Sequence, residues 1–204
     1  MNIKWLFFDV GTTLVNEEKA YDHRVLDIIK DTNISFEEFD NKRIELAKRG
    51  LDGNSAAIKH FNLIKTPWHS EDEVLFKDTI DVLEYLMSKG YKLGIIANQK
   101  KGLETRLSEF GILKYFDLVI ASEEVLVSKP DKEIFNIALS KMNSKPQECV
   151  MIGDRLDNDI IPASNLGLKT IWIRQGLAIY QDIKLGIKHA DYVVSSLKEI
   201  KEIL

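Results

Sequence analysis

Short apolar runs, each ending in a polar or small residue, recur along the chain. The strong runs cover residues 3–10, 92–98, 118–121, 149–153 and 169–173, and a weaker one covers 191–194. Each run is almost continuously apolar rather than alternating, which is typical of parallel strands buried on both faces. The pattern therefore predicts six strands of a largely parallel sheet.

Helical spacing of apolar residues lies between most of these runs. Residues 80–87, 103–110, 134–142 and 160–166 carry apolar side chains three or four positions apart, and glycines end three of these stretches. Strand–helix alternation of this kind predicts an α/β fold with a doubly wound parallel sheet.

The segment from residue 16 to 75 breaks the alternation, because helical spacing continues through it without a strand. We expect residues 1–15 and 76–204 to form the α/β core. Residues 16–75 are expected to form a small, inserted, all-helical cap over the strand ends, with its two connections acting as hinges.

Composition narrows the class of protein. The 204 residues are 45% hydrophobic and 29% charged, as in ordinary globular proteins. The net charge of −4 argues against a sequence-independent nucleic-acid binder. We find neither an apolar stretch approaching membrane-spanning length nor a signal-peptide pattern, so we expect a cytoplasmic protein without a membrane partner. The oligomeric state is not predictable from these features.

Polar side chains follow the predicted strands at one edge of the sheet, where ligands bind in such folds. They are Asp9, Asn98, Lys129, Asp154, Asp157 and Asp159. Carboxylates and a lysine that converge there would hold a hard cation such as Mg²⁺ together with an anionic group. The turn at Gly11–Thr13 leaves backbone N–H groups free for an anion, and a carboxylate beside it can attack phosphorus.

These segments, in this order, resemble the four motifs of the haloacid dehalogenase (HAD) superfamily of hydrolases. The matching segments are Asp9-Val10-Gly11-Thr12-Thr13, Ile95-Ile96-Ala97-Asn98, Ser128-Lys129-Pro130 and Gly153-Asp154 with Asp159. The inserted helical segment matches the position of the family's cap between the first and second motifs.

The resemblance implies a role for each matching residue. Asp9 corresponds to the nucleophile and a Mg²⁺ ligand, and Lys129 to the lysine that neutralises the nucleophile and the phosphoryl group. The metal ligands would be Asp9, the carbonyl of Gly11, Asp154 and Asp159. Phosphate contacts are expected from Thr13, whose family counterpart stabilises the turn, from Asn98 and from Lys129.

Two positions depart from the family pattern. Gly11 stands where the family's phosphatases carry an acid/base aspartate, and Ala97 replaces a phosphate-binding Ser or Thr. General acid–base catalysis contributes about 10²–10⁴-fold, so we expect a weakened enzyme that prefers esters with good leaving groups. If alkyl phosphates are nevertheless cleaved, His23 is the first candidate for the missing acid.

Three functions remain open from the sequence. The leading one is a Mg²⁺-dependent phosphatase of a small phosphorylated metabolite, acting through an aspartyl-phosphate. A binding protein that has lost turnover would explain both Gly11 and Ala97. A 2-haloacid dehalogenase needs no second aspartate, but it also needs no metal, which fits the acid-rich fourth motif less well.

Overall fold

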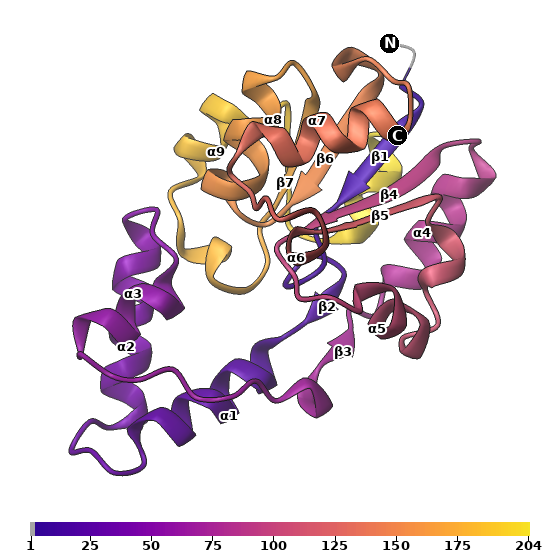
Figure 1. The fold of residues 1–204 in the computed structure, drawn as a ribbon. Coiled ribbons are helices and arrows are strands. Elements are labelled where there is room, and N and C mark those ends of the chain that lie inside the picture. Colours follow the sequence, from indigo (N-terminus) through magenta and orange to yellow (C-terminus); the bar gives the residue numbers. More distant parts are fainter. Residues whose placement is uncertain (1–2) are drawn as a thin grey trace.

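A computed structural model describes residues 3–204, and it has a six-stranded parallel sheet at its centre (Figure 1). The strand order is β5-β4-β1-β6-β7-β8. The bounds are β1 Trp5–Phe8, β4 Lys92–Ala97, β5 Leu118–Ala121, β6 Cys149–Gly153, β7 Lys169–Ile173 and β8 Tyr192–Val194. All six predicted strands and the α/β class are confirmed.

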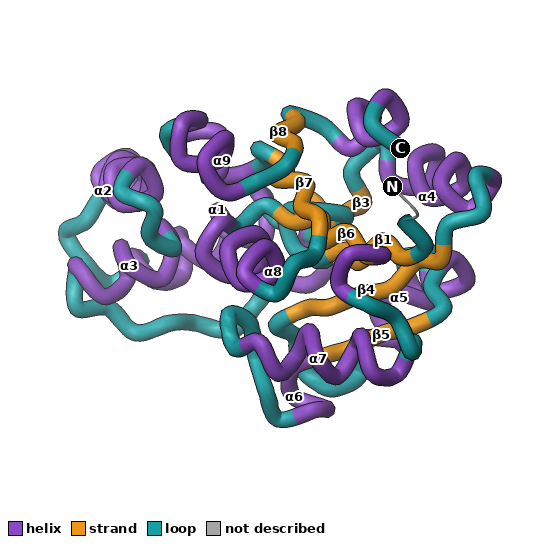
Figure 2. Tube along the Cα trace, turned by 90° about the horizontal axis from the view of Figure 1, so that it is seen from above, coloured by secondary structure: helices purple, strands orange, loops and turns teal. Residues whose placement is uncertain are grey.

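Both faces of the sheet are covered by helices (Figure 2). Successive strand side chains point to opposite faces. Leu6 and Phe8 of β1 pack with α4 (Thr79–Ser88) and α5 (Leu103–Glu109), whereas Phe7 packs with α7 (Lys132–Lys141) and α8 (Ile161–Asn165). Burial of both faces is the reason why the strands read as continuous apolar runs.

The segment between β1 and α4 forms a separate helical lobe, at the lower left of Figure 1. It leaves and rejoins the core through a two-stranded antiparallel pair, β2 (Val15–Asn16) with β3 (Val74–Leu75). The lobe contains α1 (Glu18–Ile29), α2 (Phe36–Lys48), α3 (Gly53–His60) and the short helix η1 (Ser70–Asp72). Its own apolar cluster includes Val25, Phe39 and Ala57.

Local signals begin the two later helices of the lobe. The Ser35 hydroxyl accepts a hydrogen bond from the backbone N–H of Glu38, and the Asp52 carboxylate accepts one from Ser55. Both are side-chain caps that satisfy free N–H groups in the first turn.

Some elements differ from the sequence prediction. The strands β2 and β3 were not predicted because two residues are too few for a recognisable period. The region predicted as one helix over 160–166 begins with a π-helical turn, η4 (Leu156–Ile160), before α8. Two further helices are α6 (Ser122–Val125) and α9 (Ile183–His189), and the remaining short helices are η2 (Leu113–Tyr115), η3 (Pro146–Glu148), η5 (Gly176–Tyr180) and η6 (Leu197–Glu202). Within residues 3–204, every helix is too short or too polar to cross a membrane.

Candidate functional site

Three carboxylates meet where β1 and β6 end. These strands are neighbours, Phe8 is level with Ile152, and the backbone N–H of Asp9 donates to the Ile152 carbonyl at 2.9 Å. Asp154 follows β6 directly. Carboxylate oxygens of Asp9, Asp154 and Asp159 all lie within 4.8 Å of one another, so the structure brings together the acidic residues singled out in the sequence.

Asp159 reaches this cluster because the chain winds into a π-helical turn after Asp154. Its Oδ2 accepts a hydrogen bond from the backbone N–H of Arg155 at 3.0 Å. A Cβ at position 153 would lie 2.3 Å from that same oxygen, so only glycine allows the Asp159 carboxylate to pass so close to the strand. Such π turns are frequent at functional sites.

Lys129 is buried between two of the carboxylates. Its Nζ donates to Asp9 Oδ1 at 2.7 Å, to Asp159 Oδ1 at 2.6 Å and to the carbonyl oxygen of Ile96 at 2.7 Å. Burial alone would lower the pKa of Lys129, but the ion pairs with Asp159 and Asp9 outweigh burial, and the pKa is raised. Lys129 therefore stays charged and holds Asp9 in place; all three of its N–H donors are used, so contact with phosphate requires exchange of one bond.

The negative charge of the cluster exceeds its positive charge. Burial, and then repulsion by Asp159 and Asp9, raises the pKa of Asp154 well above its usual value. Burial also raises the pKa of Asp159 to about 6, although Lys129 opposes this shift. Three carboxylates with one lysine leave an unbalanced set of hard oxygen donors, which is the donor chemistry that suits a divalent cation such as Mg²⁺.

Two residues predicted to touch phosphate have other contacts. Thr13 is fully buried, and its hydroxyl donates to Asp154 Oδ1 at 3.4 Å, so its side chain supports Asp154. The Asn98 amide bonds both backbone groups of Lys129: Nδ2 donates to the Lys129 carbonyl and Oδ1 accepts from the Lys129 N–H, each at 2.8 Å. The Asn98 side chain thus fixes the lysine loop, and a phosphate contact at this position would fall to its backbone.

Gly11 lies beside a residue that the sequence did not single out, Glu17. A Cβ built at Gly11 would be 2.6 Å from Glu17 Oε2 and 2.7 Å from Oε1. The Glu17 side chain is buried, and burial is the main cause that raises its pKa to about 7, against the opposing charge of Arg106. No sequence signal marks Glu17, because its place beside Gly11 depends on the path of the chain through β2.

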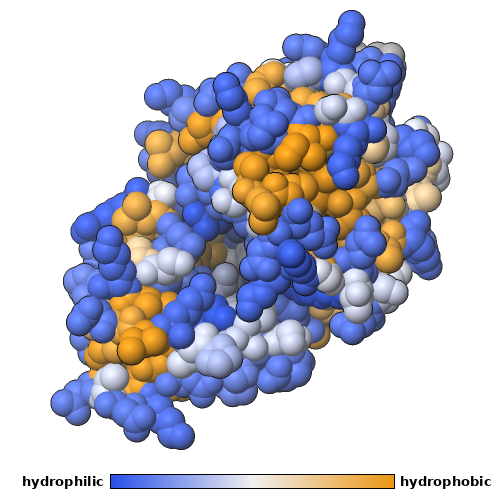
Figure 3. Space-filling view, viewed as in Figure 1, coloured by the Kyte–Doolittle hydropathy of each residue, from blue (hydrophilic) through white to orange (hydrophobic). Residues whose placement is uncertain are grey.

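A cavity of about 390 Å³ lies between the helical lobe and the strand ends. Figure 3 shows the surface hollowed between the two lobes, with hydrophilic residues around the hollow. Asp154 lines the cavity from the core, and Glu17 lines it from the connection between β2 and α1. From the lobe, Arg43 lines it and is paired with Asp22 and Asp40. The cavity is also lined by Arg155, whose guanidinium is paired with Asp52 and Asp157.

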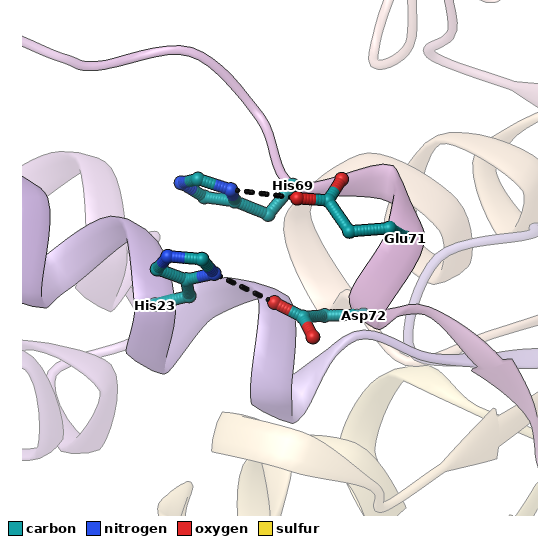
Figure 4. Close-up of side chains that lie close together, drawn as sticks. All are labelled: His23, His69, Glu71 and Asp72. Atoms are coloured by element: carbon teal, nitrogen blue, oxygen red, sulfur yellow. Dashed lines mark hydrogen bonds and ion pairs between the residues drawn. The ribbon is translucent and has the colours of Figure 1, made fainter.

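His23 has a place that does not suit the role considered for it. It points from α1 toward η1, where Nδ1 bonds Asp72 Oδ2 at 2.8 Å (Figure 4). Its ring stacks on that of His69 at a centroid distance of 3.5 Å. His23, His69, Glu71 and Asp72 form a second group of possible metal ligands, which sequence spacing did not predict because it forms across the two connections of the lobe.

Comparison with known proteins gives a single family. The family model described as haloacid dehalogenase-like hydrolase matches residues 6–173. A glyceraldehyde 3-phosphate phosphatase of Methanocaldococcus jannaschii is 33% identical, over 99% of this chain and 97% of its own. A putative pyrophosphatase, PpaX, of Clostridium perfringens is 28% identical, over 99% of this chain and 97% of its own.

Solved structures agree with the sequence comparison. A HAD phosphatase from Thermococcus onnurineus superposes with a TM-score of 0.69 at 28% identity, covering 98% of this chain and 97% of its own. The similarity extends over both the sheet and the helical lobe, so it concerns the whole architecture around the carboxylate cluster.

Proposed function

We propose that this chain, which belongs to the haloacid dehalogenase-like hydrolase family, is a phosphatase of small phosphorylated metabolites with Asp9 as its nucleophile. The observation that carries the proposal is the Asp9 carboxylate at the edge of the sheet, bonded to buried Lys129 and next to Asp154, which lines the cavity. The relatives named as phosphatases support the same activity.

The proposed reaction has two displacements at phosphorus. In the first, an Asp9 carboxylate oxygen attacks, the bond from phosphorus to the ester oxygen breaks, and the alcohol leaves with a proton. In the second, water attacks the aspartyl-phosphate, loses its proton, and the bond from phosphorus to Asp9 breaks. Lys129 pairs with Asp9 and orients it for attack, and Asp159 holds Lys129.

We propose Mg²⁺ as the cofactor, held by Asp9, Asp154, Asp159 and the carbonyl of Gly11. The shared hard donors and the unbalanced negative charge of the cluster fit this ion. Bound there, Mg²⁺ would neutralise charge on the phosphoryl oxygens. Asp159 is already bonded to Lys129 and to the Arg155 N–H, so its part in holding the ion is the more indirect one.

The cavity indicates what the rest of the substrate looks like. Among the cavity-lining residues, the two cationic side chains are Arg43 and Arg155, and each is already paired with two carboxylates. A second phosphate would therefore find no free positive charge. We propose that the substrate is a monophosphate with a short, uncharged, hydroxyl-bearing chain, which is also consistent with the relatives named as glyceraldehyde 3-phosphate phosphatases.

The helical lobe of residues 16–75 is proposed to act as a cap over this site. Its side chains form one wall of the cavity, and both of its connections run through the β2–β3 pair. Movement about that pair would admit substrate and exclude water afterwards.

The test is phosphate release by the purified protein with Mg²⁺ from a panel of sugar and triose monophosphates, bisphosphates and pyrophosphate. We expect monophosphates to be hydrolysed best. Asp9→Asn should lower kcat at least about 10³-fold. Asp117→Asn is the matched control, because Asp117 pairs with Lys92 at the opposite end of the sheet. Absence of hydrolysis of every ester by the wild type would refute the proposal.

A further inference from the structure

Glu17 occupies the space that an aspartate at position 11 would fill. Its two carboxylate oxygens are 2.6 and 2.7 Å from a Cβ built on Gly11. An aspartate's own carboxylate oxygens lie about 2.4 Å from its Cβ, from standard bond lengths. The carboxyl group missing from residue 11 is therefore present at that place, supplied by a residue six positions later.

A left-handed backbone conformation is not the reason why residue 11 is glycine. Among the described residues, the glycines with positive φ are Gly50, Gly90, Gly102, Gly111, Gly167 and Gly176. Gly11 is not one of them, so the turn itself accepts an L-residue here, and a side chain at position 11 would have to displace the Glu17 carboxyl. The Glu17 carboxyl fills the space that is left by the missing side chain of residue 11.

The surroundings fix Glu17 in this place. Arg106 Nη2 contacts Glu17 Oε1 at 3.3 Å, while the same guanidinium binds Glu73 through two shorter bonds of 2.6 and 2.9 Å. Trp68 Nε1 also donates to Glu73 Oε1. Glu73 is thus the main partner of Arg106. The carboxylate oxygens of Glu17 face Gly11, and Glu17 lines the cavity together with Asp154.

We propose that Glu17 is the general acid and base of this enzyme, in place of the aspartate that Gly11 lacks. In the first displacement, the Glu17 carboxyl gives its proton to the ester oxygen as the bond to phosphorus breaks. In the second, the Glu17 carboxylate takes a proton from the attacking water, which returns Glu17 to its starting form. This inference rests on the proposed phosphatase function and adds the identity of the proton donor.

The proposal changes what is expected of the wild type. The sequence alone predicted poor hydrolysis of alkyl phosphates, on the premise that nothing replaces the missing acid. With Glu17 in that role, alkyl monophosphates should be turned over at rates comparable with aryl phosphates, because the alkoxide leaving group receives a proton.

The primary test compares Glu17→Gln with the wild type on an alkyl and an aryl phosphate. We expect kcat for glycerol 3-phosphate to fall about 10²-fold, with the phosphorylation step on p-nitrophenyl phosphate affected far less. Intact-mass measurement after mixing with the aryl phosphate should show a phosphorylated enzyme that accumulates, because the base for the second displacement is lost. Glu73→Gln is the matched control: Glu73 is a second buried acid on Arg106, and its loss should change turnover of both substrates by the same factor.

A second pair of variants tests the position rather than the residue, and remains informative if Glu17→Gln folds poorly. Gly11→Asp/Glu17→Ala should regain most alkyl-phosphate turnover, whereas the isosteric Gly11→Asn/Glu17→Ala should not. Proximity has a readout independent of activity: Gly11→Ala should lower the melting temperature of the wild type but much less in the Glu17→Ala background.

Two results would overturn the assignment while leaving the phosphatase function intact. One is an active wild type in which Glu17→Gln lowers alkyl and aryl turnover equally, without accumulation of phosphorylated enzyme. The other is equal activity of the Asp and Asn double variants. An inactive wild type would instead refute the phosphatase function itself.

Discussion

Thr12 is held in a backbone conformation that a β-branched residue rarely adopts, with φ of +58° in the turn that follows Asp9. Non-glycine residues in this region carry about 1–3 kcal/mol of strain. Thr12→Gly should therefore raise the free energy of unfolding by about 1 kcal/mol, after the entropy cost of glycine is subtracted. Urea denaturation measures this change in the free energy of unfolding. Thr12→Ala keeps the strained backbone, so its free energy of unfolding should rise clearly less than that of Thr12→Gly. Equal increases in the two variants would contradict the strain argument.

Among single residues, those in the sequence motifs could be predicted from the sequence, whereas their side-chain contacts could not. Asp9, Lys129, Asp154 and Asp159 were identified because each follows a buried strand in a recognisable order, and they do lie together. The sequence cannot show whether a side chain faces a ligand or a neighbour. The Thr13 hydroxyl, expected to contact phosphate, lies on Asp154 in this structure.

Glu17 was missed for a different reason. An acid in a polar stretch such as Asn16-Glu17-Glu18 resembles any solvated helix start. A tight turn after Val10, in which the Val15 N–H donates to the Val10 carbonyl, brings the chain back beside Gly11, so that the side chain after β2 meets Gly11. Two-residue strands have no readable period, so this contact could not be predicted.

At the scale of elements, the end of β4 and the loop that carries Lys129 are joined by the Asn98 amide. Asn98→Ala removes two hydrogen bonds to the Lys129 backbone and should cost about 1–2 kcal/mol of stability. Because Lys129 orients Asp9, kcat should fall more than KM rises. Steady-state kinetics and thermal denaturation measure the two effects. Asn136→Ala, which loses one surface hydrogen bond to Glu133, is the control and should change neither kcat nor stability. An unchanged kcat in Asn98→Ala would contradict the positioning role of Asn98.

The two connections of the helical lobe are tied to α5 by a single guanidinium. Arg106 binds Glu17 on the outgoing connection and Glu73 on the returning one, and both acids are buried. Arg106→Gln leaves two buried carboxylates without their cation, so the free energy of unfolding should fall by about 3 kcal/mol. In urea denaturation, Arg49→Gln, which breaks an exposed pair with Glu45, should cost much less. Equal losses would contradict the argument.

The elements of the core were predictable because burial on both sides leaves a clear apolar signal. The helices of the lobe were predicted from their spacing, and the caps at Ser35 and Asp52 agree with it. The π-helical turn at Leu156–Ile160 was not predicted, since the helix expected over residues 160–166 began at its end and its extra residue leaves no mark in the apolar pattern. Its effect is to bring Asp159 inward, so the omission concerned the site more than the fold.

At the scale of the whole molecule, stability in the absence of metal should depend on pH. Burial raises the pKa of Asp159 from 3.8 to about 6 and that of Glu17 from 4.5 to about 7. Both groups bind protons more tightly when folded, so their contribution is present at low pH and is lost as pH rises from about 4 to about 7.

This dependence can be measured as urea midpoints across that pH interval, with and without Mg²⁺. We expect the midpoint to fall with rising pH in the metal-free protein. Added Mg²⁺ should raise the midpoint more at about pH 7 than at about pH 5, because protons compete for the same carboxylates. A midpoint that rises with pH without metal would contradict the charge balance described for the site.

The whole molecule combines a carboxylate cluster on the sheet with a helical lobe, and the cavity between them is lined by Asp154 of that cluster. The central claim is that Asp9 attacks phosphorus. The most direct measurement is acid quenching of the enzyme during turnover of an aryl phosphate, followed by peptide mapping by mass spectrometry. The account predicts one phosphoryl group, on the peptide that contains Asp9, absent in Asp9→Asn and increased in Glu17→Gln. Steady phosphate release without any phosphorylated Asp9 in these quenched samples, even in Glu17→Gln, would contradict it.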